Sequence, residues 1–327
     1  MSSEAPAIKL FFREAIARAV REEMAADPRV IVLGQDVGAF GGSYKEFLGL
    51  YDQFGPARVR DTPVAEAAMV GLGVGAAAAG YRPLVSITYM DFLMLGLDPL
   101  VNYAAKARFK TGGQITAPVV VKTTAGAKGQ GVAHSQCLEA WLMGVPGLVV
   151  VAPSNAADAY GLMKSALRHD GPVVYVDHKR LFPTAGETPS AETCTPIGQA
   201  AVVRPGEHVT IASHGYMVRI AGEAAAHLSR DGVSCEIVDL RTLAPLDVAT
   251  VARSAARTGA LVTLEEGQLA CGVGAEVAFR VQEQIGAVRV GRVGALPAPV
   301  SSNPVLEAAA IPDAARVVDA VRRVLKT

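Results

Sequence analysis

Cysteine is scarce in this sequence and shows no pattern. The four cysteines, Cys137, Cys194, Cys235 and Cys271, lie far apart, and no CxxC pair occurs. Zinc sites and disulfide frameworks use closely and regularly spaced cysteines, so the spacing argues against both. We expect isolated, buried thiols in a reducing compartment.

Excess charge and long apolar runs are also absent. Lys+Arg and Asp+Glu each number 31, so the formal net charge is zero and nothing favours nucleic acid or an anionic membrane. The opening stretch, MSSEAPAIKLFFREAIARAV, has no uninterrupted apolar core of signal-peptide type. The Ala/Gly run at 67–80 is shorter than the roughly 20 residues that span a bilayer. We therefore expect a cytoplasmic protein.

Aromatic residues are few and several common motifs are missing. Aromatics make up 6% of a chain that is 50% hydrophobic, so small aliphatic residues must build the core, which favours closely packed α/β layers. A weakly charged, apolar chain also indicates subunit contacts. No GxGxxG follows an apolar strand run, and neither a P-loop nor a GxSxG elbow occurs, which argues against the corresponding nucleotide-binding and hydrolase sites.

Short apolar runs alternate with helical patterns along the whole chain. This alternation predicts an α/β fold, with a doubly wound parallel sheet in the first part. We predict a first domain at 1–182, a Pro/Thr/Gly/Glu-rich linker at 183–200 and a smaller α/β domain at 201–327. The strands expected in the first domain are 30–33, 58–61, 83–88, 118–123, 148–151 and 172–176.

One carboxylate, Glu66, stands at the head of the most apolar and glycine-rich stretch, TPVAEAAMVGLGVGAAAAG at 62–80. We predict a helix over this stretch, with Pro63 at its first position. The simplest interpretation of Glu66 is an acid favoured by the helix dipole, worth a few tenths of a kcal/mol. A capping box is a poor fit, since Glu66 is four residues after Thr62 rather than three. The small residues Gly71, Gly75 and Ala79 predict close approach of another helix.

Three further residues are candidates for a site because they follow predicted strands. Open α/β sheets bind ligands at the carboxyl ends of their strands. His134 follows the glycine-rich loop AGAKGQGVAH, and His178 follows the run VVYVD. Tyr89 comes just after the run at 83–88 and offers a flat face for a ring. Each has a structural alternative, since a single His or an aromatic residue is more often a packing residue than a ligand.

Several segments together resemble one family, the β-subunits of the E1 component of thiamine-diphosphate-dependent 2-oxo acid dehydrogenases, which includes pyruvate, branched-chain and acetoin types. The resemblance covers nearly the whole chain, in order. Its segments are GQDVGAFGG, RDTPVAE, GLGVGAAAAGYRPL, DFLMLGLDPLVNYAAK, AHSQ, PGLVVVAPSNAADAYGLMKSALR, VDLRTLAPLD and EEGQLACGVGAEV. The resemblance implies a pyrimidine-binding domain followed by a transketolase-type C-terminal domain.

The resemblance also implies roles for the candidate residues. The acid of the family's TPxxE motif, here Glu66, hydrogen-bonds N1′ of the cofactor's aminopyrimidine and favours the tautomer that removes the thiazolium C2 proton. The histidine of HSQ, here His134, faces the substrate and assists decarboxylation or acyl transfer. Tyr89 packs near the pyrimidine ring. Gln35 replaces the glutamate of the family's GEDV motif, and we count it among the cofactor-binding residues.

One family motif is missing from the chain. The family binds the diphosphate through Mg²⁺ held by a GDG motif and a later Asn, and no GDG occurs here. The resemblance therefore implies an α₂β₂ heterotetramer in which an α-subunit holds the Mg²⁺ and the cofactor is shared. It further implies a lipoyl-bearing E2 partner and a structural K⁺ bound by backbone carbonyls near 164–171.

Two other functions stay open at this stage. One is a two-chain, transketolase-like ketol or acyl transferase that uses the same Glu66 chemistry with an aldehyde or acyl carrier as acceptor. The other is a non-catalytic subunit that retains the fold, against which the presence of both Glu66 and His134 argues. The main expectation is an oxidoreductase component that decarboxylates a 2-oxo acid or cleaves acetoin and transfers the acyl unit to lipoyl-E2.

Overall fold

The computed structural model describes residues 8–189 and 193–326 and divides the chain into two compact units. The first unit comprises 1–125 and 142–197, and the second comprises 126–141 and 198–327. The division between 197 and 198 falls inside the segment predicted as a linker, 183–200. That segment also contains a strand, β8 (Ala185–Thr188), which pairs antiparallel with β1 (Ile8–Phe11).

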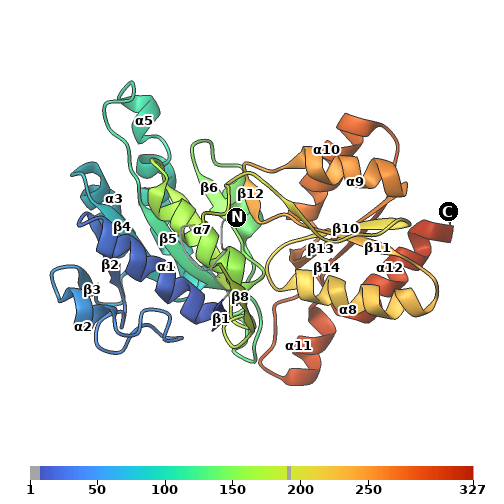
Figure 1. The fold of residues 1–327 in the computed structure, drawn as a ribbon, viewed down its shortest axis with the longest axis horizontal. Coiled ribbons are helices and arrows are strands. Elements are labelled where there is room, and N and C mark those ends of the chain that lie inside the picture. The colour runs from blue at the N-terminus through green and yellow to red at the C-terminus, as the bar shows by residue number, and fades with distance from the viewer. Residues whose placement is uncertain (1–7, 190–192, 327) are drawn as a thin grey trace, which may run out of the picture. The chain divides into compact units, whose positions relative to one another are not determined.

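The first unit is a parallel sheet with helices on both faces (Figure 1). Its strands follow the order β6-β7-β5-β4-β2-β3, and each pairs parallel with its neighbours. These strands are β2 (Val30–Gly34), β3 (Val59–Asp61), β4 (Arg82–Ile87), β5 (Val120–Ala125), β6 (Val149–Val151) and β7 (Val173–His178). β5 and β7 are buried along their whole length, as strands covered on both faces must be.

The helices of the first unit connect strands in opposite directions. They are α1 (Phe12–Ala26), α2 (Leu50–Phe54), α3 (Glu66–Ala78), α4 (Met90–Leu93), α5 (Ala107–Lys110) and α7 (Ala156–Arg168), with a 3₁₀ turn η1 (Met94–Gly96) and a π-helix η2 (Asp98–Ala104). The connection from β3 to β4 runs one way across the sheet and that from β6 to β7 runs the other. Because such connections are right-handed, α3 and α7 lie on opposite faces. This confirms the predicted doubly wound sheet.

The helix predicted to begin at Thr62 begins four residues later. Glu66 is the first residue of α3 and Ala65 is its N-cap, so the placement of Pro63 at the first helical position was wrong. The Thr62 backbone N–H donates to the carbonyl of Gly34 at 3.0 Å, which keeps this residue in the connection after β3. A residue before proline is biased towards extended backbone, which explains why the helix does not start here.

The glycines of α3 lie on two different faces of the helix. An added Cβ at Gly71 or Gly75 would meet nothing within 4 Å, so within the described residues there is open space beside both glycines and the predicted helix partner stays a prediction. Gly73 is the position where only glycine fits, because a Cβ there would lie 2.4 Å from Val85 Cγ2. The close contact is therefore between α3 and β4. The face that carries Gly75 and Ala79 is exposed in this chain.

The second unit is a smaller α/β layer (Figure 1). Its strands follow the order β14-β13-β10-β11-β9, parallel except for β9 at one edge. The strands of this part of the chain are β9 (Ala201–Arg204), β10 (Val209–Ser213), β11 (Cys235–Asp239), β12 (Thr242–Ala244), β13 (Ala260–Gln268) and β14 (Arg289–Ala295). The helices are α8 (Met217–Arg230), α9 (Val248–Thr258), α10 (Val273–Ile285), α11 (Pro304–Ala310) and α12 (Ala314–Lys326), while α6 (Glu139–Met143) spans the boundary between the units.

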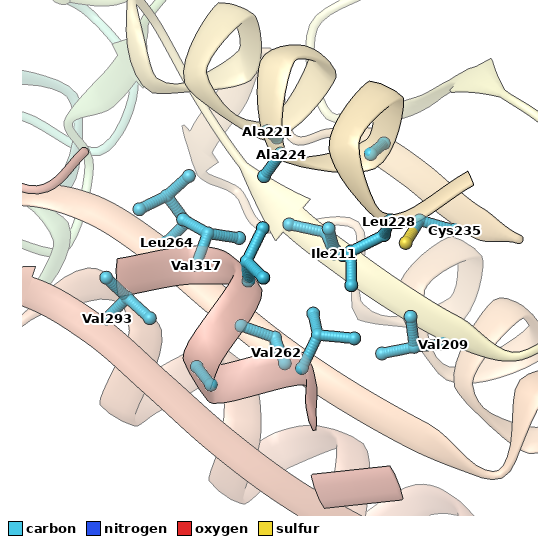
Figure 2. Close-up of a cluster of buried hydrophobic side chains, with 14 of the residues drawn as sticks. Val209, Ile211, Ala221, Ala224, Leu228, Cys235, Val262, Leu264, Val293 and Val317 are labelled. Atoms are coloured by element: carbon cyan, nitrogen blue, oxygen red, sulfur yellow. The ribbon is translucent and has the colours of Figure 1, made fainter. Parts of the chain in front are cut away.

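The core of the second unit lies between its sheet and the helices α8 and α12. Figure 2 shows Ala221, Ala224 and Leu228 of α8 above Ile211 and Val262 of the sheet. This small-aliphatic core is what the low aromatic content predicted. Cys235 lies within the cluster, and burial raises the pKa of its thiol to about 11. All four cysteines are free thiols.

Candidate functional site

The carboxyl edge of the first unit's sheet collects three of the predicted site residues. Gln35 directly follows β2, Glu66 follows β3 by a short connection, and Tyr89 follows β4. These three strands are parallel neighbours, with Gly34 in register with both Asp61 and Ser86. Their carboxyl ends therefore meet at one edge, where open α/β sheets place their ligands.

Glu66 is a buried carboxylate at the start of a helix. Only 9% of the residue is exposed. The helix dipole gives a first-turn acid only a small stabilisation. The dipole alone therefore does not explain why the Glu66 carboxylate is buried. Gly96 of η1 packs against this turn, because a Cβ there would lie 2.6 Å from Val70 Cγ2 and 3.4 Å from the carbonyl oxygen of Glu66. The first turn of α3 is thus enclosed by the segment that follows Tyr89.

Thr62 supplies a polar atom at the same edge. Its Oγ1 is buried and has no hydrogen-bond partner among the described residues. Buried hydroxyls are normally paired, and an unpaired one costs free energy unless a ligand or water satisfies it. The sequence suggested only a helix cap for Thr62. Its position between β3 and α3 makes it a further candidate for contact with a ligand.

The ring of Tyr89 is held by two neighbours. The Lys179 Nζ lies 4.5 Å from its ring centroid, and the Phe92 ring lies edge-on at 6.2 Å between centroids and 63° between planes. Lys179 is completely buried. One face of Tyr89 is therefore covered by an ammonium group, so a ring ligand would have to use the opposite face or the edge.

Gln35 and His178 make local contacts. Gln35 Nε2 donates to Asp36 Oδ2 at 3.5 Å, the outer limit of a hydrogen bond. His178 ends β7 and is 6% exposed; its Nδ1 accepts from the backbone N–H of Arg180 at 3.1 Å. That acceptance implies that the Nε2 carries the proton in the neutral ring. This hydrogen bond ties the His178 ring to the turn after β7.

A buried charge cluster beside His178 was missed in the sequence. Lys122 of β5 is fully buried, with its Nζ 2.7 Å from Asp177 Oδ2 and 3.1 Å from Glu46 Oε1. Burial alone would lower the pKa of Lys122, but the two carboxylates outweigh it and the pKa is raised. Burial raises the pKa of Asp177 despite the attraction of Lys122. A lysine in the otherwise apolar run VVVKTT was the available signal.

The same cluster anchors the glycine-rich loop that follows Gln35. Glu46 Oε2 accepts from the backbone N–H of Tyr44 at 2.9 Å, and the Tyr44 ring stacks on Phe182 at 4.4 Å between centroids. The loop after β2 is therefore tied through Glu46 to the centre of the sheet. The buried charges of Lys122, Asp177 and Glu46 therefore help to position the loop at the carboxyl edge of the sheet.

His134 lies in the second unit, whereas Glu66, Tyr89 and Gln35 lie in the first. It is half-buried in a turn, and its backbone N–H donates to the carbonyl of Gly131 at 3.2 Å. Two carboxylates hold the loop before it. Ala127 N–H donates to Glu266 Oε1 at 2.7 Å, and Gly129 N–H donates to Glu307 Oε2 at 2.5 Å. The loop that carries His134 is thus fixed by its backbone to the second unit.

The start of α6, close after His134, carries an unusual acid. Burial, with the charges of Glu266 and Glu265 nearby, raises the pKa of Glu139 to about 8, although a backbone hydrogen bond opposes the shift. Glu265 is also buried and its pKa is raised, although the N–H groups of Gly274 and Val273 oppose the shift. The second unit thus keeps Glu139 mostly protonated at neutral pH.

We expect the stability of the chain to fall as pH rises from the unfolded pKa of Glu139, 4.5, to its folded value of about 8. In that window the unfolded state loses the proton and the folded state keeps it, so each pH unit costs up to about 1.4 kcal/mol. Glu139→Gln should flatten this slope. Urea unfolding of both proteins at pH 5 and pH 8 measures it, and equal slopes would remove Glu139 as the cause.

The predicted K⁺ site stays a prediction. Arg82 donates through Nη1 to the carbonyls of Leu167 at 3.1 Å and His169 at 3.0 Å, and through Nη2 to Asp170 at 2.5 Å. Two backbone carbonyls within 164–171, the stretch predicted to bind K⁺, therefore each accept a hydrogen bond from Arg82. Within 8–189 and 193–326, no group of three or more His, Cys, Asp or Glu is arranged to hold a metal ion.

In the same residues, 8–189 and 193–326, no helix is long and apolar enough to cross a membrane.

Comparison with known proteins accounts for both units. Residues 9–184 match the model of the transketolase pyrimidine-binding domain, and residues 198–317 match that of the transketolase C-terminal domain. The solved structure of a split-gene transketolase, in the form of an inactive beta4 tetramer, superposes with a TM-score of 0.77 at 25% identity, covering 96% of this chain and 98% of that one.

Curated relatives are more similar in sequence. The chain is 42% identical to the rice (Oryza sativa subsp. japonica) pyruvate dehydrogenase E1 component subunit beta-1, mitochondrial, over 98% of this chain and 87% of that protein. It is 40% identical to the Cupriavidus necator acetoin:2,6-dichlorophenolindophenol oxidoreductase subunit beta, over 97% and 98%. With both transketolase-type domains in order, this chain belongs to the family of pyruvate and acetoin dehydrogenase E1 β-subunits.

Proposed function

We propose that this chain, together with an α-subunit, uses thiamine diphosphate to decarboxylate a 2-oxo acid or cleave acetoin, and that it passes the acyl unit to a lipoyl-bearing E2. The observation that carries the proposal is the buried carboxylate of Glu66 at the carboxyl edge of the pyrimidine-binding domain. A carboxylate enclosed by apolar residues is costly unless it has a task or a partner.

The residues at this edge fit the cofactor's aminopyrimidine. Glu66 offers a carboxylate for a ring nitrogen, Tyr89 an aromatic ring, and Thr62 a buried Oγ1 without a partner among the described residues. Bound thiamine diphosphate supplies an acidic carbon that adds to the 2-oxo group and a sink for the electrons released on decarboxylation.

Glu66 has the central role in this proposal. Its carboxylate holds a proton at N1′ of the aminopyrimidine, and the surrounding residues, with Gly96 packed against the first turn, exclude water from that hydrogen bond. Tyr89 orients the ring from a position fixed by Lys179 and Phe92. Gln35, as a neutral amide, can donate and accept hydrogen bonds there but cannot carry a proton away.

His134 is proposed to face the substrate and to assist decarboxylation or acyl transfer. Its support is its place in a turn after a glycine-rich loop held by Glu266 and Glu307. An imidazole can exchange a proton near neutral pH, which suits either step.

An α-subunit is proposed to complete the site. No GDG motif for the diphosphate-bound Mg²⁺ occurs in the sequence, so the Mg²⁺ ligands are assigned to that partner in an α₂β₂ heterotetramer. The split-gene transketolase that superposes on this chain is an inactive tetramer of β-chains, in keeping with a site that needs two kinds of chain. A structural K⁺ near 164–171 and a cytoplasmic location belong to the same proposal.

A two-chain ketol transferase is the second candidate, and the likeness to that split-gene transketolase is the observation that favours it. The E1 relatives are 40% and 42% identical against 25% for the transketolase, over similar coverage. We therefore place the E1 function first. Burial of Glu66 argues against a third option, a non-catalytic subunit, because a buried acid without a task costs stability.

The shared site makes a direct prediction about binding. Thiamine diphosphate with Mg²⁺ should bind this chain alone at least about 100-fold more weakly than the assembled heterotetramer, a difference of about 2.8 kcal/mol. Isothermal titration calorimetry of both samples, with Mg²⁺-free titrations as controls, provides the comparison. Equal affinity for the chain alone would contradict the division of the site between two subunits.

A further inference from the structure

A pocket of about 310 Å³ lies in the second unit, at the carboxyl ends of the adjacent parallel strands β13 and β14. Three segments line it: 132 and 135–138 of the loop after β5, 266–268 at the end of β13, and 295 with 297–300 after β14. All three belong to the second unit. The volume is at the lower end for small-molecule sites, which run from about 300 Å³ upwards. We propose that this pocket binds a small molecule that carries a primary ammonium group on a short aliphatic body.

The charge of the pocket selects a cation. Glu266 is its acidic side chain, and no lysine, arginine or histidine is among the described residues that line it. Glu266 is 7% exposed, and its Oε1 accepts from the backbone N–H of Ala127 at 2.7 Å, which fixes the carboxylate. A fixed carboxylate in a confined space attracts an ammonium group more strongly than one in open water.

Two further acids, Glu265 and Glu139, lie near Glu266. Glu265 accepts from the backbone N–H groups of Val273 and Gly274, at 2.8 and 2.9 Å. Glu139 lies close enough to Glu266 and Glu265 for their charges to help raise its pKa to about 8. The charges of Glu266 and Glu265 thus act at the same end of the second unit, with the charge of Arg292 opposing that of Glu265, and a cation bound beside Glu266 would be attracted by them.

A buried hydroxyl is the independent sign of a ligand. Ser135 lines the pocket, is 2% exposed, and its Oγ has no hydrogen-bond partner among the described residues. An ammonium group has three N–H donors and no acceptor, so it can donate to Glu266 and to Ser135 Oγ together. This pairing would satisfy the unpaired oxygen.

The remaining walls suit an aliphatic chain rather than a hydrated ion. Val132, Leu138, Pro297 and Val300 supply apolar surface. The acids near the pocket do not gather as metal ligands, because no group of three or more His, Cys, Asp or Glu among the described residues is arranged to hold a metal ion. An organic ammonium with a short apolar body therefore matches both the polar groups of Glu266 and Ser135 and the apolar walls of the pocket.

Three probes of equal size test the proposal: n-butylamine, butyramide and butyrate, titrated into the full-length chain and followed by ligand-observed NMR. We expect butylamine to bind in the millimolar range and at least about tenfold more tightly than butyrate. Glu266→Gln, which keeps an acceptor for Ala127 N–H, should weaken butylamine about tenfold and leave butyramide almost unchanged. Ser135→Ala should weaken butylamine about threefold. The exposed substitution Glu283→Gln is the matched control and should change nothing.

Several outcomes decide the question. Three results would each overturn the proposal: butyrate that binds as tightly as butylamine, butylamine that does not bind up to about 50 mM, or Glu266→Gln that binds butylamine with the same affinity as the wild type.

A capped lysine amide separates two sources of the ammonium group. If it binds as well as butylamine, a lysine side chain of a partner is the ligand class, and if only butylamine binds, the ligand is a free amine. These measurements need no α-subunit, so they are independent of the proposed enzyme activity.

Discussion

Glu66→Ala is expected to lower the turnover of the assembled enzyme by about 10²–10⁴-fold, the range associated with loss of a positioned proton-transfer group. The fold should remain intact, because a first-turn acid contributes at most about 1 kcal/mol through the helix dipole. The measurement is cofactor-dependent dye reduction by the wild-type and variant heterotetramers, with thermal unfolding measured alongside.

Two controls separate chemistry from structure in that experiment. Glu66→Gln keeps the size and hydrogen-bonding capacity of the side chain but not its charge, so turnover should stay low while stability stays close to that of the wild type. Glu223→Ala removes an exposed glutamate from α8 and should leave turnover unchanged. Near-normal turnover in Glu66→Ala would remove this residue from the mechanism.

Lys122→Met is expected to destabilise the chain by about 3–5 kcal/mol, the usual cost of breaking a buried ion pair from one side. Methionine approximately fills the space, so the loss comes from leaving Asp177 and Glu46 buried without their cation. Urea unfolding gives the free energy. The exposed Lys128→Met should change it by less than about 0.5 kcal/mol.

The pH dependence of that loss identifies its origin. Without Lys122 the buried Asp177 carboxylate binds a proton more readily, so its folded pKa rises further and the folded variant is relatively more stable at low pH. The destabilisation should therefore be larger at pH 8 than at pH 5. A loss that is equal at both values would point to packing rather than charge.

Much of the architecture could be predicted because local sequence and tertiary packing agree. The start of helix α7 is recognisable in the sequence, since Asn155 caps it by accepting from Asp158 N–H at 2.9 Å. In α8, the buried residues Met217, Ile220, Ala221, Ala224, Ala225 and Leu228 recur with a helical period. Buried parallel strands such as β5 and β7 are recognisable because both faces are apolar.

Features that depend on distant contacts could not be predicted. The loop that carries His134 joins the second unit through Glu266 and Glu307, which lie 139 and 178 residues along the chain from Ala127 and Gly129. The antiparallel pair of β1 with β8 likewise joins the two ends of the first unit. No local pattern marks such partners.

That Gln35, Glu66 and Tyr89 follow adjacent strands could be predicted from the sequence, but their surroundings could not. Glu66 stands out in the sequence because it is a single acid in an apolar stretch. The cover that Lys179 provides on one face of Tyr89, and the unpaired hydroxyl of Thr62, follow only from the way β3, β4 and β7 end at one edge. The glycine stripe stays a prediction, since spacing alone cannot tell which face of α3 packs within the chain; Gly73 packs against β4, and Gly75 does not.

The most direct test is dye reduction by this chain co-expressed with its candidate α-subunit, with pyruvate, branched-chain 2-oxo acids and acetoin as substrates. The account predicts reduction with one of these substrates, and none when thiamine diphosphate is omitted. Absence of reduction with all of them, from a correctly assembled heterotetramer, would contradict the E1 function and favour ketol transfer to an aldehyde acceptor.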